Sequence, residues 1–165
     1  MLKYFSFFLI LISANVYADE TKKWKALGDW DILVDPAVGN GCLAQRDFED
    51  GMRVQIGAVP SREGGFFAAY HSDWTHIEDG EVGVLNFDFG DARFAGEVVG
   101  RLSNTLPGGY AFFDNPNFVT EFAKRNSVRV WGEREDVIEI SLAGTAKAID
   151  AVLACQKEQP KIVAE

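Results

Sequence analysis

Two histidines stand close together in the sequence, with an aspartate between them. His71, Asp73 and His76 belong to the run His-Ser-Asp-Trp-Thr-His, and the chain has no other histidine. If His71 and Asp73 share one side of a strand and His76 returns across a turn, the three side chains converge on a metal ion such as zinc. Polar turn residues after a strand explain the same residues without a metal. We therefore expect no metal and no cofactor, and a small metal-assisted hydrolase is the alternative function.

Other catalytic arrangements have less support. Ser72 follows His71, but the nucleophile motif Gly-x-Ser-x-Gly is absent, and adjacency in sequence is not triad geometry. Glycoside hydrolysis needs a pair of carboxylates. The candidate acids all lie in turn-like clusters, where solvated side chains are expected, namely Asp47, Glu49, Asp50, Glu78 and Asp79. The glycine-rich segments 39–41, 64–65 and 107–109 predict turns rather than a phosphate site. We expect a protein that is not an enzyme.

Two predicted strand ends combine a tryptophan with nearby acids. The six residues are Trp74, Glu78, Asp79, Trp131, Glu133 and Glu135. Exposed aromatic anchors with acidic surroundings are suited to binding a basic protein partner. We expect these residues to form a binding surface, and the alternative is that both indoles are buried while the acids only solvate turns.

Charge and length narrow the class of partner. The chain has 165 residues, which is the length of one domain, and 25 acidic against 16 basic residues give a formal charge of -9. No basic stripe is present, which excludes a nucleic-acid partner held through its phosphates. Acidic loops also leave open a periplasmic inhibitor or immunity protein that binds a basic enzyme cleft.

Residues 1–18 have the features of a secretory signal peptide. Lys3 precedes an apolar run, and Val16-Tyr17-Ala18 places small or branched residues at the -3 and -1 positions of a cleavage site. The run is short for the roughly 20 residues of a spanning helix. We expect a globular domain over 19–156, a flexible tail over 157–165, and a periplasmic or secreted protein of a Gram-negative bacterium, with no membrane span after cleavage.

Export determines how the two cysteines are interpreted. Cys42 and Cys155 are the only cysteines, and in an oxidising compartment such a pair predicts one structural disulfide. The alternative is two buried free thiols. A bridge that closes a loop of about 100 residues contributes up to about 4.7 kcal/mol in the chain-entropy model.

Hydrophobic periodicity predicts an antiparallel sheet followed by two helices. Alternation of apolar and polar residues, interrupted by Gly, Asp and Asn, predicts strands over 30–35, 41–48, 52–59, 65–72, 81–89 and 93–102. A short helix is expected from Pro116 to about residue 125, then a hairpin over 127–132 and 136–142. A second helix is expected from Thr145, as its cap, to about Gln156. The predicted fold class is mainly β (α+β), a single antiparallel β-sandwich-like domain with a short helix and a C-terminal helix packed on the sheet.

The two ends of the mature chain resemble a known family. Gly28-Asp29-Trp30, the cysteine shortly after it, and the strand and helix over 138–150 together resemble the invasion-associated locus B family of bacterial periplasmic proteins. The segment 118–130 resembles the element before that family's last hairpin. The family often has further cysteines in the middle of the chain, and this sequence lacks them. The resemblance implies an exported, non-catalytic interaction protein that binds a protein or cell-surface partner, as in the host-cell contact ascribed to some members.

Overall fold

The computed structural model describes residues 21–133 and 137–160, and the predicted signal segment 1–18 lies outside them. The strands in these ranges are β1 (Lys22–Leu27), β2 (Trp30–Asp35), β3 (Gly41–Asp47), β4 (Arg53–Gly57), β5 (Gly65–Tyr70), β6 (Val82–Asp88), β7 (Arg93–Ser103), β8 (Leu106–Phe113), β9 (Ser127–Trp131) and β10 (Ile138–Ser141). The helices are α1 (Pro116–Lys124), α2 (Thr145–Glu158) and a 3-10 turn over Pro36–Val38.

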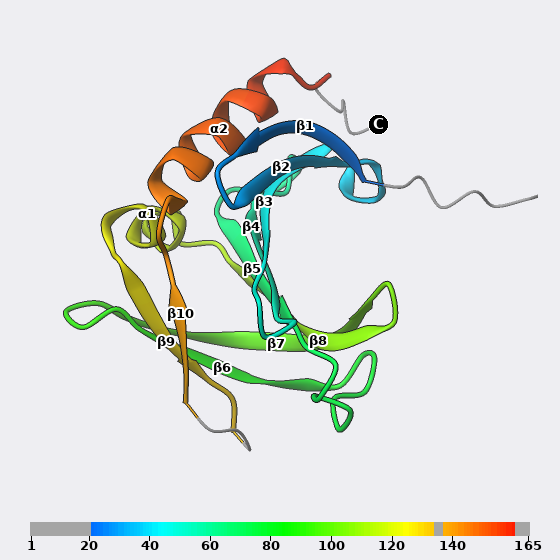
Figure 1. The fold of residues 1–165 in the computed structure, drawn as a ribbon, viewed down its shortest axis with the longest axis vertical. Coiled ribbons are helices and arrows are strands. Elements are labelled where there is room, and N and C mark those ends of the chain that lie inside the picture. Colours follow the sequence, from blue (N-terminus) through cyan, green and yellow to red (C-terminus); the bar gives the residue numbers. More distant parts are fainter. Residues whose placement is uncertain (1–20, 134–136, 161–165) are drawn as a thin grey trace, which may run out of the picture.

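The strands form one antiparallel sheet in the order β1-β2-β3-β4-β5-β8-β7-β6-β9-β10. The sheet curls on itself, so that β9 and β10 face β3 to β5 across the interior, with α1 and α2 at one end (Figure 1). The predicted fold class is confirmed. Its two layers are the two halves of a single curled sheet.

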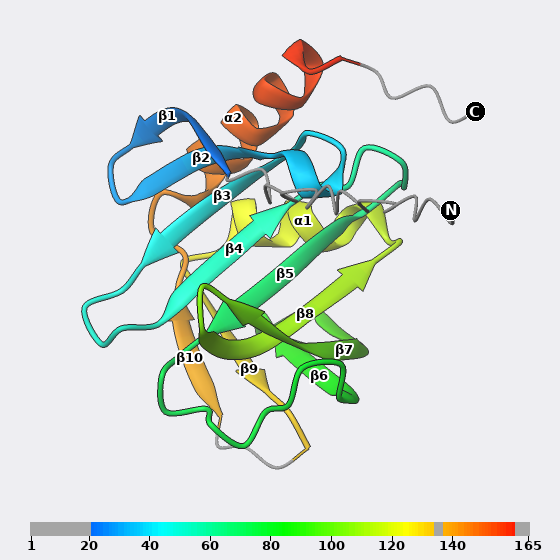
Figure 2. The ribbon, with the colours of Figure 1, turned by 90° about the vertical axis from the view of Figure 1, so that its right-hand side faces the viewer.

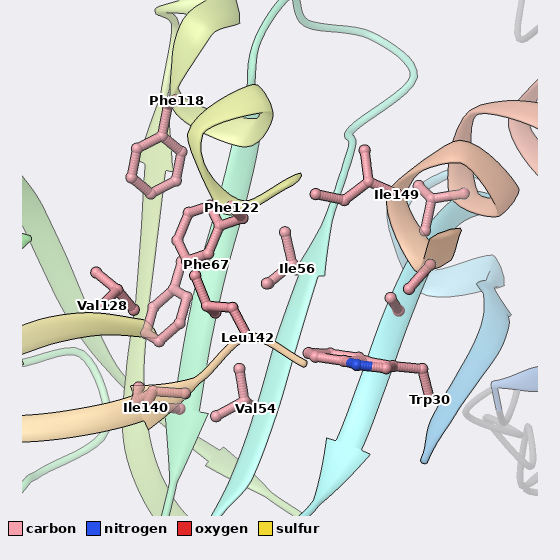
Figure 3. Close-up of a cluster of buried hydrophobic side chains, with 14 of the residues drawn as sticks. Trp30, Val54, Ile56, Phe67, Phe118, Phe122, Val128, Ile140, Leu142 and Ile149 are labelled. Atoms are coloured by element: carbon pink, nitrogen blue, oxygen red, sulfur yellow. The ribbon is translucent and has the colours of Figure 1, made fainter. Parts of the chain in front are cut away.

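The main core fills the interior at the α1 end of the sheet. Phe118 and Phe122 lie four residues apart on α1, and both side chains are fully buried against the sheet (Figure 3). The Phe87 ring meets Phe67 and Phe118 edge to face, with ring centroids 5.1 Å apart in both pairs. Such edge-to-face contacts add about 0.5–1.5 kcal/mol each beyond the burial of the rings.

Strand β5 is buried on both of its faces. Phe67 and Ala69 face the main core, whereas Phe66 and Tyr70 belong to a second apolar cluster on the outer face. Burial raises the pKa of the Tyr70 hydroxyl to about 12. The segment therefore has the continuous apolar sequence expected of a strand covered on two sides. Figure 2 shows β5 near the middle of the sheet, between β4 and β8.

The predicted disulfide is present and joins β3 to α2 through Cys42 and Cys155. The side-chain amide of Gln156 reinforces the same contact, because its oxygen accepts the Cys42 N–H at 2.9 Å and its nitrogen donates to the Asn40 carbonyl at 3.4 Å. Helix α2 continues to Glu158, so the first two residues of the predicted tail are helical. Residues 161–165 of that tail lie outside the described residues.

The start of α2 differs from the sequence prediction. Gly144, not Thr145, occupies the cap position, with φ at 80°, and no side chain caps the helix. Glycine adopts this left-handed conformation without steric cost. Thr145 is the first helical residue and its side chain is fully buried. The carbonyl of the preceding Ala143 accepts a hydrogen bond of 2.9 Å from the indole of Trp30.

The sequence pattern does not predict two of the strands, β1 and β8. Strand β1 has lysine at three of its six positions, and these charged side chains obscure the apolar alternation. Strand β8 contains the Pro-Gly-Gly segment 107–109 that predicted a turn. A Cβ atom at Gly108 would collide with the Ala69 carbonyl, and one at Gly109 would lie 2.6 Å from a Val98 methyl. These glycines permit close strand packing, and the prediction of a turn there is wrong.

The apolar alternation changes phase within β6. Phe87, and Phe89 just after the strand, are buried in the core. Val82 and Val84 lie on the opposite face, because they are separated from Phe87 by an odd number of residues. They are 62% and 40% exposed, respectively.

The disulfide gives a first testable prediction. We expect Cys155→Ser to lower the melting temperature by about 10 °C, since a bridge across so long a loop contributes about 2–4 kcal/mol. Calorimetry of the variant, with the Cys42→Ser/Cys155→Ser double variant as a control for the remaining thiol, measures the effect. Equal melting temperatures with and without reductant would contradict it.

Asp88 gives a prediction about acid stability. Its buried carboxylate accepts the Gly90 N–H at 2.7 Å and Arg129 at 2.6 Å, and Arg93 lies 3.2 Å away. The Gly90 hydrogen bond, followed by the two guanidinium charges, lowers the pKa of Asp88. Because the pKa of Asp88 is lower in the folded state than in the unfolded state, its ionised carboxylate stabilises the fold at pH values above the ordinary aspartate pKa. This stabilisation is lost as the pH falls below about 4.

We therefore expect Asp88→Asn to lower the melting temperature at pH 7 and to flatten its decline between pH 5 and pH 2. Thermal scans across that range measure both effects. The exposed Asp150, replaced by Asn, is the control and should leave the profile unchanged. Parallel pH profiles for wild type and Asp88→Asn would refute the role of this carboxylate.

Candidate functional site

A cavity of about 140 Å³ lies inside the curled sheet, next to the segment between β5 and β6. Its walls come from β5 to β10 and are mostly apolar. The principal wall residues are Phe67, Ala69, Leu85, Val98, Val130 and Ile140. No residue of α1 or α2 lines it. The cavity is thus at the end of the interior that the phenylalanine core does not fill.

Glycines border the cavity on three neighbouring strands. Gly83 on β6, Gly100 on β7 and Gly109 on β8 all line the cavity, and Gly100 pairs directly with Gly109 across the two strands. Neighbouring strands therefore present no side chain at these positions. Interior glycine in a strand is a recognisable sequence signal for the close approach of another segment, and this signal could have drawn attention to this region.

Gly100 also holds the segment 71–81 against the sheet. Its carbonyl accepts the Gly80 N–H at 2.9 Å, and its own N–H donates to the Glu81 carbonyl at 2.7 Å. A Cβ atom at Gly100 would collide with the Glu78 carbonyl. The segment that forms one side of the cavity is therefore positioned by backbone hydrogen bonds that require glycine.

The two aromatic regions predicted from the sequence meet at this cavity. Trp74 reaches it from the segment after β5, and Trp131 and Glu133 reach it from the end of β9. Trp74 packs partly against the main core, with its ring 5.8 Å from that of His71. Both indoles are half-buried, so neither is fully shielded from solvent.

The other predicted surface residues lie apart from the cavity lining. Glu78 and Asp79 are exposed on the same segment as Trp74 but do not line the cavity. Glu135 lies outside the described residues. Sequence reasoning missed His76, Ile77 and Glu81 as neighbours of Trp74 in this lining.

Strands β6 and β9 separate beside the cavity. Their pairing runs from Asp88 opposite Arg129 to Asn86 opposite Trp131, whereas β6 begins at Val82. Beyond the last pair, Val82 and Val84 line the cavity and remain exposed. The exposed side chains of these valines lie on the outer face of β6 beside the cavity, and exposed apolar surface beside a cavity is typical of a binding site.

The metal-ligand candidates are not arranged as one site. Nδ1 of His71 accepts the Asp73 N–H at 3.1 Å, which places the ring proton on Nε2, and Nε2 lies 3.0 Å from the Asp50 carbonyl. Both ring nitrogens of His71 are therefore engaged by the backbone. His76 lines the cavity instead. Across 21–133 and 137–160, no three His, Cys, Asp or Glu residues are close enough to share a metal ion.

The lining has an acidic character at its polar positions. Glu81 and Glu133 line the cavity together with His76, and the described lining contains no lysine or arginine. One Glu81 carboxylate oxygen accepts the Glu78 N–H at 3.4 Å. The lining also lacks Ser, Cys and Lys, the usual covalent nucleophiles, so its chemistry favours binding over covalent catalysis.

No family model, curated protein or solved structure matches this chain. No helix among the described residues is long and apolar enough to cross a membrane. The function is therefore inferred from the cavity itself. An apolar protein cavity of about 150 Å³ binds benzene, so a space of this size holds one ring or a short alkyl chain.

Gly100 gives a testable prediction about the cavity wall. We expect Gly100→Ala to lower the melting temperature by several degrees, since overpacking typically costs about 1–3 kcal/mol and the added methyl displaces the Glu78 backbone. Gly83→Ala is the matched control, because a Cβ atom there lies 3.6 Å from a Val98 methyl, an ordinary contact. Thermal scans and the amide NMR shifts of residues 76–81 measure the effect. Equal stability of the two variants would show that the segment does not depend on Gly100.

Proposed function

We propose that this protein is an exported, non-catalytic binding protein that holds an apolar group of its ligand or partner in the cavity between Trp74 and Trp131. The observation that carries the proposal is the cavity itself, apolar inside and bordered by exposed valines. This role agrees with the interaction proteins of the invasion-associated locus B family, to which the ends of the sequence are similar.

The walls of the cavity are suited to binding because they are built on strands. Val98, Val130 and Ile140 lie on β7, β9 and β10, which all belong to one hydrogen-bonded sheet. A rigid wall does not have to be ordered when the ligand arrives, and this lowers the entropy cost of binding. A ring or short alkyl chain that enters the cavity exchanges water for apolar contacts, worth about 0.8 kcal/mol for each buried methylene.

The proposed location outside the cytoplasm rests on two features. The disulfide between Cys42 and Cys155 is of the kind that persists in oxidising compartments. The first eighteen residues have the charge, apolar run and cleavage pattern of a signal peptide. A periplasmic or secreted protein would meet partners at or beyond the cell surface.

Filling the cavity tests the proposed function. Hexan-1-ol is the probe, and its titration is followed by amide NMR shifts of the wild-type protein. We expect saturable shifts at residues 98–100, 109 and 130–132. Val98→Phe should weaken binding at least about tenfold, because the larger side chain occupies the cavity.

The neighbouring Val99 provides the matched control. It lies on the opposite face of β7 from Val98 and does not line the cavity, so Val99→Phe should bind hexan-1-ol as wild type does. If Val98→Phe fails to fold, Ile138→Phe fills the cavity from β10 instead. Absence of saturable shifts in the wild type, or equal binding by Val98→Phe and Val99→Phe, would overturn the proposal.

A further inference from the structure

We propose that the outer face of the sheet binds a tetrahedral oxyanion group, a phosphate or a sulfate, between Arg101 of β7 and the hydroxyl groups of Tyr70 and Tyr110. None of these three residues lines the cavity, and the two tyrosines belong to the apolar cluster on the opposite face of the sheet. Figure 2 views the sheet from this side, with β5 and β8 next to each other. Ligand binding here therefore does not depend on the proposed function.

Tyr70, Gly108 and Arg101 form one row across three neighbouring strands. Gly108 of β8 pairs with Tyr70 of β5 on one side and with Arg101 of β7 on the other. A Cβ atom at Gly108 would lie 2.5 Å from Cδ1 of Tyr70, so the tyrosine ring extends over the glycine toward β7. The absence of a side chain at Gly108 thus lets Tyr70 lean toward Arg101.

Tyr110 and Arg62 extend the site along β8. Tyr110 lies two residues after Gly108 and therefore on the same face of the strand. Its ring stacks on that of Phe66, with ring centroids 5.1 Å apart. The guanidinium of Arg62 lies 3.7 Å from the centre of the Phe112 ring, which is the next side chain on that face of β8. A second positive charge is thus held beside the tyrosines.

The polar groups of this face have no protein partners in the described chain. Tyr70 is only 6% exposed, yet its hydroxyl makes no hydrogen bond to any residue within 21–133 and 137–160. The Tyr110 hydroxyl makes none in these ranges either, and neither Arg62 nor Arg101 forms an ion pair there. A tyrosine with a buried ring usually finds a partner for its hydroxyl. The arrangement therefore favours a ligand that brings its own oxygen acceptors.

The positive charge of Arg101 reaches both hydroxyl groups. Burial raises the pKa of Tyr70 to about 12, and the guanidinium of Arg101 acts in the opposite direction. Burial also raises the pKa of Tyr110, again opposed by the charges of Arg62 and Arg101. Both hydroxyls are therefore protonated at neutral pH and can donate hydrogen bonds to an anion.

The acidic character of the whole chain does not prevent anion binding at this face. The formal charge is -9, but at physiological ionic strength charges more than about 8 Å apart are largely screened. Two acids share the face, Asp35 at the end of β2 and Glu97 on β7. Neither of them forms an ion pair with Arg62 or Arg101. The local charge is therefore set by the two arginines.

A tetrahedral oxyanion matches these donors better than a carboxylate does. The guanidinium of Arg101 offers two parallel N–H donors, and each tyrosine hydroxyl offers one more. A phosphate or sulfate group has at least three free oxygens, so it can accept all of these hydrogen bonds at once. An acidic side chain presents only two oxygens and one charge. We therefore expect the site to prefer phosphate and sulfate over carboxylates.

Four anions test this preference. Phosphate, sulfate, acetate and chloride are titrated at pH 7 and constant ionic strength, with amide NMR shifts of the wild-type protein as the readout. We expect saturable shifts at residues 69–70, 100–102 and 108–111 with phosphate and sulfate, with a Kd on the order of 1 mM, and binding of acetate at least about threefold weaker. Equal shifts with chloride and phosphate would show a general salt effect and overturn the proposal.

Phenyl phosphate distinguishes a free ion from a phosphate group carried by a larger molecule. Binding as tight as that of inorganic phosphate, or tighter, would assign the site to a phosphorylated partner. Clearly weaker binding would assign it to the free ion. Both results support an oxyanion site.

Removal of single donors completes the test. Arg101→Gln should weaken phosphate binding about fivefold to tenfold, and Tyr70→Phe about threefold, because each variant removes a hydrogen-bond donor. Tyr70→Phe keeps the buried ring, so its melting temperature without phosphate should equal that of the wild type. Lys147→Gln is the control, since it removes one positive charge from an exposed position on α2. Unchanged affinity in Arg101→Gln, or equal losses in Arg101→Gln and Lys147→Gln, would overturn the proposal.

Discussion

Helix α2 holds together the two ends of the curled sheet. In the described chain β1 and β10 are the two edges of the sheet, and α2 follows β10 directly and packs on β1 to β3. The Cys42–Cys155 bridge fixes the helix to β3, and the Trp30 indole donates to the Ala143 carbonyl just before the helix begins. A single covalent bond and a few buried polar contacts therefore keep β9 and β10 opposite β5. The walls of the cavity depend on that arrangement.

The interior of the sheet is filled at one end and hollow at the other. At the α1 end, the Phe87 ring packs edge to face against both Phe67 and Phe118 and fills the space. At the opposite end, the cavity is bordered by Gly100 and Gly109, which pair with each other across β7 and β8. The fold can therefore keep a stable core and an open cavity side by side, since the rings stabilise the strands that border the empty space.

The sequence by itself determined the features that depend on local pattern or on a unique pairing. Two cysteines allow one intramolecular bridge, and the alternation over 30–35 predicts the strand that the structure contains at Trp30–Asp35. Phe118 and Phe122 are four residues apart and predict a buried helical face, which the structure confirms. Local rules failed where tertiary context overrode them. The three lysines obscured β1, and glycines needed for packing in β8 were interpreted as a turn.

Only the tertiary structure decided the site. Trp74 and Trp131 meet because β5, β8, β7, β6 and β9 are neighbours in that order, which places distant segments at one opening. Such pairing is non-local, and it depends on which edges remain available once the sheet curls. No periodicity within a single strand contains that information. The sequence therefore indicated Trp74 and Trp131 as candidate residues, and the order of the strands placed them at one cavity.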